Sequence, residues 1–324
     1  MDALSEILRA IHLSGTAFID ADLSAPWAVQ TPAPAEIAKH LAPGRGRVIP
    51  YHLVAEGSCS VRIGSGPPIA LATQDVVWFP HGDVHVLASE PGLEPMRITA
   101  DAIVRLARPD SVTSTRYGGT GPKMRLICGF FACDTELSEP LVRSLPRILK
   151  FRGDPQTAAA LLPASLAASR RNRGLPAPPG FQAILCKLSE LLFLDAVRAY
   201  VETLPEEEGG WFAGLKDPLV AHTLALVHER PAAGWTLERL ASAAGTSRTT
   251  LAERFVSCLG NPPMQYIAQW RLRLAAQALV STDRAIKKIA SDAGFGTSVA
   301  FGRAFKREMG TSPGAWRKRA HNAR

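Results

Sequence analysis

The C-terminal third of the 324-residue chain carries one sequence unit twice. The copies read LERLASAAGTSRTTLAERFVSCLGNPP at Leu237–Pro263 and IKKIASDAGFGTSVAFGRAFKREMGTSP at Ile286–Pro313. Residues in the first half of the copies match at one constant interval, and residues in the second half match at an interval one residue longer. The matched pairs are Ala241/Ala290, Ser242/Ser291, Ala244/Ala293 and Gly245/Gly294, then Phe255/Phe305, Gly260/Gly310 and Pro263/Pro313. The repeat predicts two copies of one structural unit.

Each copy has the pattern of two helices joined by a tight turn. A short amphipathic helix ends at Gly245 or Gly294, where a left-handed residue turns the chain, and a second helix begins at a Ser or Thr. This order is typical of a helix-turn-helix. Capping side chains followed by proline occur at Asp217-Pro218, Asn261-Pro262 and Ser312-Pro313. The whole module is therefore predicted to be helical.

A single long helix is predicted between the copies, from Pro262 to about Ser281. At 1.5 Å per residue, its roughly 20 residues span about 30 Å. Successive major-groove segments on one face of B-DNA are about 34 Å apart. The connecting helix is thus long enough to hold both second helices against one face of a duplex. A protein-binding helical array is the alternative, but such arrays need three or more repeats.

Residues Asp217 to Arg319 resemble the DNA-binding module of the AraC/XylS family of transcription regulators. The second copy carries the family pattern most fully, at Ile289-Ala290, Gly294-Phe295, Ser298, Phe301, Arg303, Phe305-Lys306, Gly310, Ser312-Pro313 and Trp316-Arg317. The resemblance implies that the second helix of each copy enters the major groove of double-stranded DNA. The implied base-facing positions are Thr249, Ala252 and Glu253 in the first copy, and Ser298, Val299 and Arg303 in the second.

The side chains at these positions suit direct reading of bases. Arg303 can make a bidentate contact to guanine O6 and N7, Glu253 can accept from cytosine N4, and Val299 can touch a thymine methyl. The alternative for Arg303 is a phosphate contact or an ion pair with a nearby acid. Four further cations are expected to contact phosphates, unless they are solvated surface charges: Arg248, Arg254, Lys306 and Arg307.

The segment from Ala35 to about Phe151 consists of short β-rich runs broken by Gly and Pro, which predicts an antiparallel barrel or sandwich. From about Val48 to Asp134 it resembles the cupin family. Pro80–His85 fits the second cupin signature, Pro-x-Gly-x-x-His. His52 and Glu56 match the later part of the first signature, with Pro50 where a cupin enzyme usually has its first histidine. The expected fold is α+β and multidomain: an N-terminal cupin-like β-barrel followed by helices, then an all-α double helix-turn-helix module.

The cupin resemblance implies a metal or effector site inside the barrel. The candidate residues are His52, Glu56, Cys59, His81 and His85. Imidazole with thiolate favours Zn²⁺, whereas imidazole with carboxylate also allows Fe, Ni or Mn. The alternative is that these histidines bond to backbone groups and shape an effector pocket. That alternative is favoured because the first histidine of the signature is missing.

Cysteines provide a further hypothesis. Cys59 or Cys128 would sense oxidants if its thiol were exposed and of low pKa, although most strand cysteines are buried and inert. Cys128 and Cys133 are separated by an odd interval, so one continuous strand directs them to opposite faces. Five cysteines in a long chain do not form the pattern of a disulfide framework.

Three segments are expected: a cupin-like sensory domain at 1–151, a helical segment with a linker at 152–209, and the DNA-binding domain at 210–324. A loop is predicted at Arg170–Gly180 and the linker at Glu206–Gly210. The intervening helix, 181–204, has two apolar stripes. Its second stripe either packs inside its own domain or meets the same helix of a partner in a homodimer; it comprises Leu194, Val197, Val201 and Leu204.

The positive charge of the chain lies in the repeat module. The whole chain has a formal net charge of +8; residues 216–324 hold 17 Lys and Arg against 7 Asp and Glu, and the remainder has a net charge of −2. This distribution favours attraction of the module to phosphate. The sequence has neither a membrane-spanning apolar run nor the pattern of a signal peptide, so a cytoplasmic location and no membrane partner are expected.

We therefore expect a sequence-specific DNA-binding transcription regulator, not an enzyme, that senses a small molecule, a metal or an oxidant in its barrel. Expected partners are double-stranded DNA, an unknown small effector, a second copy of the chain, and RNA polymerase if the protein is an activator. The main alternative is a cupin-type metalloenzyme, a dioxygenase or isomerase, fused to a DNA-binding module. An architectural DNA binder with an inert barrel is a further alternative, and a DNA-repair thiol transferase is disfavoured because no four-cysteine zinc spacing occurs.

Overall fold

The computed structural model describes residues 4, 14–41, 47–106, 113–133, 135–154, 157–171, 179–205 and 211–322. The chain divides into two compact units. The first, called the β unit below, comprises Leu13–Cys133 and Leu145–Thr203, and the second, the helical unit, joins Asp134–Ser144 to the chain after Leu204. Among the described residues, no helix combines the length and apolarity needed to cross a bilayer.

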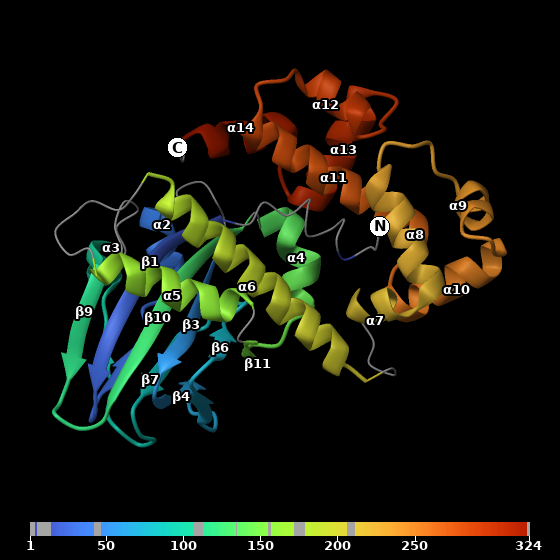
Figure 1. Ribbon diagram of the computed structural model, residues 1–324. Helices are drawn as coiled ribbons and strands as arrows, with labels where there is room; N and C mark the ends of the chain where they lie inside the picture. The colour runs from blue at the N-terminus through green and yellow to red at the C-terminus, as the bar shows by residue number, and fades with distance from the viewer. Residues whose placement is uncertain are drawn as a thin grey trace. The chain divides into compact units, whose positions relative to one another are not determined.

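The β unit contains two sheets, in agreement with the expected barrel or sandwich (Figure 1). The six-stranded sheet has the order β11-β6-β3-β10-β1-β9, and the five-stranded sheet has the order β5-β4-β7-β2-β8. The strands are β1 Ser14–Ser24, β2 Ala28–Gln30, β3 Arg47–Glu56, β4 Ser58–Ile63, β5 Ile69–Ala72, β6 Asp75–Trp78, β7 His85–Ala88, β8 Met96–Arg97, β9 Thr113–Gly118, β10 Lys123–Cys133 and β11 Leu149–Arg152.

The expectation of purely antiparallel pairing is wrong at two edges. Strand β9 pairs with β1 in parallel, and β8 pairs with β2 in parallel. A hairpin turn enforces antiparallel pairing only between strands that follow each other closely. These two pairs are distant in sequence, with long connections that allow either direction. The short helices α2 (Pro34–Leu41) and α3 (Ala100–Leu106) lie in such connections.

The core of the β unit lies between the two sheets. Apolar side chains from the six-stranded sheet, such as Val54 and Leu126, pack in one cluster with Val61, Leu71 and Leu87 of the five-stranded sheet. Because side chains alternate along a strand, the neighbours of these residues point outward. Helices α5 (Ala158–Arg171) and α6 (Phe181–Thr203) belong to the same unit and lie across the six-stranded sheet (Figure 1).

One contact on this outer face requires a glycine. The Tyr51 ring packs flat over Gly129 on the neighbouring strand, and a Cβ atom at Gly129 would lie 2.2 Å from Cζ of that ring. Tyr51 also stacks on Trp78 at a centroid distance of 4.3 Å. Its hydroxyl lies 2.8 Å from Ser189 Oγ of α6. The glycine therefore allows the aromatic layer that joins the sheet to α6.

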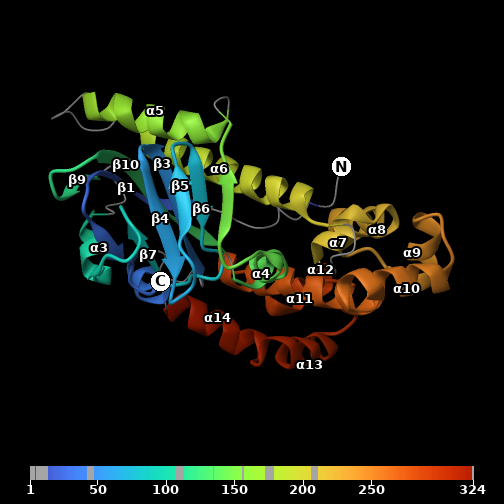
Figure 2. The ribbon, with the colours of Figure 1, turned by 90° about the horizontal axis from the view of Figure 1, so that it is seen from below.

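The helical unit confirms the internal repeat. Helices α9 and α12 have 7 residues each, and α10 and α13 have 12 residues each. Figure 2 shows α11 running between the two pairs. The helices of this unit are α4 Thr135–Ser144, α7 Trp211–Lys216, α8 Pro218–Glu229, α9 Leu237–Ala243, α10 Arg248–Leu259, α11 Pro263–Ser281, α12 Ile286–Asp292, α13 Ser298–Met309 and α14 Pro313–Asn322.

Both turns within the repeats are built on a left-handed glycine. Gly245 has φ of 68° and Gly294 has φ of 77°. In the first copy, Thr246 N–H donates to Ala241 O, and in the second, Phe295 N–H donates to Ala290 O, each at 2.9 Å. These bonds close the last helical turn. The second turn has one more residue before its Thr297 cap, which accounts for the one-residue change in the repeat interval.

The predicted helix starts are mostly confirmed. Asp217 caps α8 by accepting hydrogen bonds from Leu219 and Val220 N–H, both at 3.0 Å. The prediction that Asn261 caps the connecting helix is wrong. Pro262 occupies the cap position in an extended conformation without a side-chain hydrogen bond, because its ring fixes φ at −63°. The helix α11 therefore begins at Pro263, and its 19 residues span about 28 Å.

Helix α4 lies between β10 and β11 in the sequence, yet it clusters with the helical unit and packs against α7 and α11. No feature of the sequence predicts this placement. Most of the predicted loop Arg170–Gly180 and the predicted linker Glu206–Gly210 lie outside the described residues.

Gly129→Ala is expected to lower the free energy of unfolding of the β unit by about 1–3 kcal/mol, because the added methyl displaces the Tyr51 ring. Urea unfolding of the full chain, followed by tryptophan fluorescence, measures the change. Gly302→Ala is the matched control: no atom lies within 4 Å of its Cβ position, and alanine favours the helix by up to about 1 kcal/mol. Equal effects of the two substitutions would contradict the prediction.

Candidate nucleic-acid interface and sensory site

Helices α10 and α13 each bury one face and expose another. Phe255 of α10 and Phe301 and Phe305 of α13 are fully buried, as their spacing predicts. All but one of the predicted base-facing residues are exposed; Ala252 is half-buried. The exposed ones are Thr249, Glu253, Ser298, Val299 and Arg303. The buried aromatic residues thus fix which face of each helix a duplex can reach.

The exposed face of α13 combines a cation with an apolar side chain. Val299 is 64% exposed, and it lies one helical turn before Arg303. Within the part of the chain that the structure describes, no ion pair or hydrogen bond involves the Arg303 guanidinium. The sequence alternative of an ion pair with a nearby acid therefore does not hold among those residues.

The four candidate phosphate-binding cations fall into two groups. In the first copy, Arg248 Nη1 pairs with Glu238 Oε1 at 2.8 Å, and Arg254 pairs with the buried Asp217 carboxylate. The Arg248 hydrogen bond lowers the pKa of Glu238. In the second copy, Lys306 and Arg307 are exposed and have no ion pair within the described ranges. Of these four candidates, the two without an ion pair among the described residues therefore both lie on α13.

Two of the candidate sensory residues meet inside the β unit. His52 of β3 and His85 of β7 are buried, and their Nε2 atoms lie 2.7 Å apart. The Phe79 ring stacks on His85 at a centroid distance of 3.5 Å. His85 Nδ1 lies 2.8 Å from the Asp83 carbonyl oxygen, and Thr31 Oγ1 accepts from His85 N–H. The pair is thus a hydrogen-bonded link between the two sheets.

The hydrogen bonds fix the tautomers of the pair. A backbone carbonyl only accepts, so His85 Nδ1 carries the proton and His85 Nε2 is the acceptor. His52 Nε2 therefore donates to His85, which leaves His52 Nδ1 as an acceptor. That atom is buried and has no hydrogen-bond partner among the described residues. The chain of bonds consequently ends in one unused acceptor inside the protein.

Both imidazoles are held neutral. Burial, and then the neighbouring His85, lower the pKa of His52 well below its ordinary value. Burial lowers the pKa of His85 to about 4, against an opposing effect of its bond to the Asp83 backbone. Neutral imidazole is the form that can accept a donor or a metal at Nδ1.

The other candidate ligands do not join the histidine pair. Strand β3 has a bulge at Ala55, since Leu126 pairs with Val54 but Arg125 pairs with Glu56. A bulge reverses the alternation of side chains, so Glu56 does not share the inward face of His52. Its side chain is exposed. His81 is also exposed, with Nε2 2.8 Å from the Leu145 carbonyl oxygen.

These positions do not fit the metal centre that the cupin resemblance implied. No group of three or more His, Cys, Asp or Glu side chains that could hold a metal occurs within the described ranges. The 2.7 Å between the histidine nitrogens is a hydrogen-bond distance, and the bond occupies the nitrogen of each ring that faces the other. The bulge in β3 is the physical reason that the predicted carboxylate ligand is displaced.

The two candidate redox cysteines lack the exposure and the low pKa that a reactive thiol needs. Cys59 is buried in the apolar cluster between the sheets, and Cys128 is half-buried. Burial raises the pKa of Cys59 to about 12 and raises that of Cys128 as well. A thiol with a raised pKa is a poor nucleophile. The redox hypothesis therefore gains no support from these residues.

Two arginines that sequence reasoning did not weigh as functional residues organise the helical unit. Arg271 of α11 donates to backbone carbonyls before α9, and Arg317 of α14 donates to Leu279 O and Arg284 O. Trp316-Arg317 belongs to the motif quoted for the second copy. Arg271 had no such signal, because its acceptors are backbone atoms about 40 residues away, which no local spacing predicts.

Comparison with known proteins gives two family matches. A family described as "Cupin" matches residues 2–202, and a family described as "Helix-turn-helix domain" matches residues 240–319. An AraC-like transcription regulator of Streptomyces lividans is 31% identical, over 98% of this chain and 98% of that protein. The transcriptional regulator AlkR of Acinetobacter baylyi is 26% identical to this chain, over 99% of this chain and 100% of AlkR.

Among solved structures, the DNA-binding domain of AdpA in complex with a target DNA is 33% identical, with a TM-score of 0.32, and covers 33% of this chain and 96% of that one. The relatives that match over the full length are named as transcription regulators, and the alternative of a cupin metalloenzyme is therefore set aside. The chain belongs to the AraC family of DNA-binding transcription regulators and carries a cupin domain before its helix-turn-helix module.

Proposed function

We propose that this regulator reads a two-part DNA site with α10 and α13, and that Arg303 selects a guanine in the part read by α13. The observation that carries the proposal is the exposed guanidinium of Arg303, which has no protein partner among the described residues and lies one turn after the exposed Val299. A guanidinium suits guanine, and a valine beside it suits the methyl of a thymine. Thr249, Ala252 and Glu253 of α10 and Ser298 of α13 read the neighbouring bases.

The second copy supplies most of the electrostatic attraction in this proposal. Lys306 and Arg307 contact phosphates, which position the module without reading sequence. Arg248 and Arg254 contribute less, because each already pairs with a carboxylate of its own unit. Arg248 is exposed, so it can exchange Glu238 for a phosphate at low cost.

The cupin domain responds to a small effector that donates a hydrogen bond. His52 Nδ1, a buried acceptor without a hydrogen-bond partner among the described residues, supports that class of ligand over a metal. Helix α4 provides the route to the DNA-binding helices, because its two ends continue into β10 and β11 while the helix itself packs on α11. An effector that displaces either strand then acts on α11. The regulator works in the cytoplasm, where its DNA is, and meets RNA polymerase there if it is an activator.

The regulator acts as a homodimer through α6. The second stripe suggested by the sequence is not the exposed one: Val197 is fully buried within the β unit, and Leu194 is half-buried. Among the described residues of α5 and α6, three large apolar side chains are more than half exposed: Leu161 on α5, and Ile184 and Leu191, two turns apart on α6. A symmetric dimer buries these side chains against their copies.

Arg303→Ala is expected to weaken binding to the preferred DNA site by about 1–3 kcal/mol and to relax the preference at one base pair. The preferred site is obtained by selecting random duplexes on the full-length protein, and affinities are then measured at one stated salt concentration. Lys306→Ala is the matched control, since loss of a phosphate contact weakens all sequences alike and lowers the salt dependence. If Arg303→Ala behaved like the control, Arg303 would be a phosphate contact.

Lowering the pH is expected to destabilise the β unit. Because the folded-state pKa values of His52 and His85 lie below the ordinary 6.5, the unfolded chain binds more protons as the pH falls from 6.5 toward 4. Each buried imidazole contributes a slope of up to about 1.4 kcal/mol per pH unit. His52→Gln should reduce the slope measured by urea unfolding between pH 6 and 4.5. His40→Gln, at an exposed position, should leave this slope unchanged. Equal slopes in the two variants would refute the view that the buried histidine pair causes the pH dependence.

Replacement of Ile184 and Leu191 together by Glu is expected to convert a dimer into a monomer, because each copy would place carboxylates in the apolar contact. Light scattering after size-exclusion chromatography measures the molar mass. Lys187→Ala and Arg198→Ala together, at exposed positions of the same helix, change the net charge by the same −2 and control for charge. A mass that does not differ between the two double variants would argue against this interface.

A further inference from the structure

We propose that Arg271 is a positioning residue that locks the two helix-turn-helix units in one register, and thereby sets the base-pair spacing between the two parts of the DNA site. The proposal rests on the proposed function, because it presumes that α10 and α13 both read DNA. Arg271 itself does not touch the duplex in this proposal. It acts through the angle and separation of the two reading helices.

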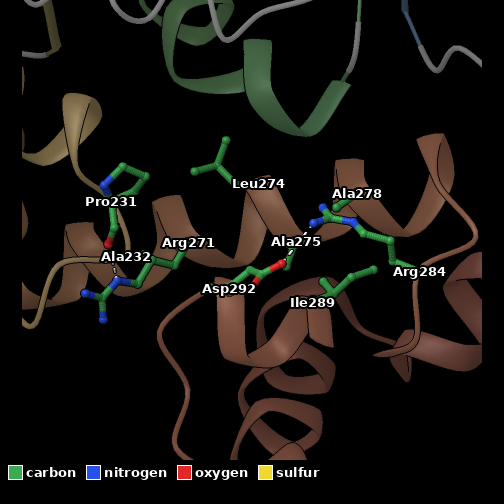
Figure 3. Close-up of a pocket in the computed structure, with 10 residues that line it drawn as sticks. Pro231, Ala232, Arg271, Leu274, Ala275, Ala278, Arg284, Ile289 and Asp292 are labelled. Atoms are coloured by element: carbon green, nitrogen blue, oxygen red, sulfur yellow. Dashed lines mark hydrogen bonds and ion pairs between the residues drawn. The ribbon is translucent and has the colours of Figure 1, made fainter. Parts of the chain in front are cut away.

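One side of Arg271 holds the first unit. The residue lies in the middle of α11, and its side chain extends to the loop between α8 and α9 (Figure 3). Its Nε donates to the Pro231 carbonyl oxygen at 2.6 Å, and Nη2 donates to the Ala233 carbonyl oxygen at 2.5 Å. Two bonds from one planar group fix both the position and the orientation of this loop. The loop leads directly into α9.

The other side of the same guanidinium contacts the second unit. A Cβ atom at Gly294 would lie 3.1 Å from Arg271 Cζ and 3.2 Å from Nη1. Gly294 is the left-handed residue that turns the chain from α12 toward α13. The absence of a side chain there lets the guanidinium lie against the turn. One side chain of the connecting helix therefore touches the loop before the first unit and the turn inside the second.

The guanidinium of Arg271 lies beside a pocket of the helical unit. A pocket of about 110 Å³ lies where α11, α12 and the α8–α9 loop meet, and Arg271 lines it together with Pro231 and Asp292 (Figure 3). A space that is not packed with side chains transmits little steric constraint. The bonds that Arg271 makes along one side of the pocket therefore join the loop to the second turn across a space that side chains do not fill.

The chemistry of Arg271 agrees with a geometric role. It is a half-buried cation whose pKa is lowered by burial, and no carboxylate pairs with it in the described part of the chain. Both of its bonded partners are neutral carbonyls. A lysine would keep the charge but could not make two bonds in one plane. Arg271→Lys is thus expected to loosen the register without changing the net charge of the module.

The test measures spacing preference. The two-part site is first selected from random duplexes with the full-length protein, and duplexes are then made with the spacer between the parts changed by one or two base pairs. For the wild-type protein, one base pair added or removed is expected to reduce affinity at least tenfold. For Arg271→Lys the reduction should fall to threefold or less, with affinity for each isolated part and the salt dependence unchanged.

Arg273→Lys, on the same helix, is the matched control and should keep the wild-type spacing preference. Arg271→Gln, which can still make one bond to a carbonyl, is measured in parallel in case the lysine variant does not fold. If either variant folds and shows the same preference for spacer length as the wild type, the proposal is overturned. A uniform loss of affinity for all duplexes, with a smaller salt dependence, also overturns it. Selection of a one-part site by the wild-type protein would instead refute the two-reader function.

Discussion

The left-handed backbone at Gly245 and Gly294 is the constraint on which the DNA-binding module depends. Only a residue without a Cβ atom adopts this conformation at low cost, and it lets the first helix of each unit satisfy its last carbonyls before the chain reverses. The angle of each second helix follows from that turn. Burial of Phe255, Phe301 and Phe305 then determines which faces of α10 and α13 remain free. The φ angles of the two glycines and the burial of the three phenylalanines thus determine which faces of α10 and α13 are exposed.

The two units use their charges differently. In the first, Arg248 and Arg254 are tied to acids that also support local structure, since Asp217 caps α8 and Glu238 begins α9. In the second, the cations on α13 have no such partners among the described residues. A positive net charge therefore says little about where a duplex binds until intramolecular pairs have been removed from the total. After that correction, we expect α13 to attract a duplex more strongly than α10.

The helical unit could be predicted from the sequence much better than the site in the β unit. Glycine turns, helix caps and apolar spacing depend on residues close together in the sequence. The repeat, its one-residue offset and the connecting helix could therefore be predicted. His52 and His85 are 33 residues apart, and the bulge at Ala55 that separates Glu56 from them depends on pairing with a strand about 70 residues later. No local pattern encodes such a bulge. The placement of α4 and the hydrogen bonds of Arg271 could not be predicted either, because both depend on residues far apart in the sequence.

The extra residue in the turn between α12 and α13 has a consequence for the promoter. Because the two turns differ in length, α13 is not related to α10 by a simple displacement. The side chains on the exposed faces of these two helices differ as well. If both helices read DNA as proposed, a bound chain distinguishes the two ends of its site, and the site has a polarity. In the proposed mode of binding, inverting such a site exchanges the ends that α10 and α13 occupy on the duplex.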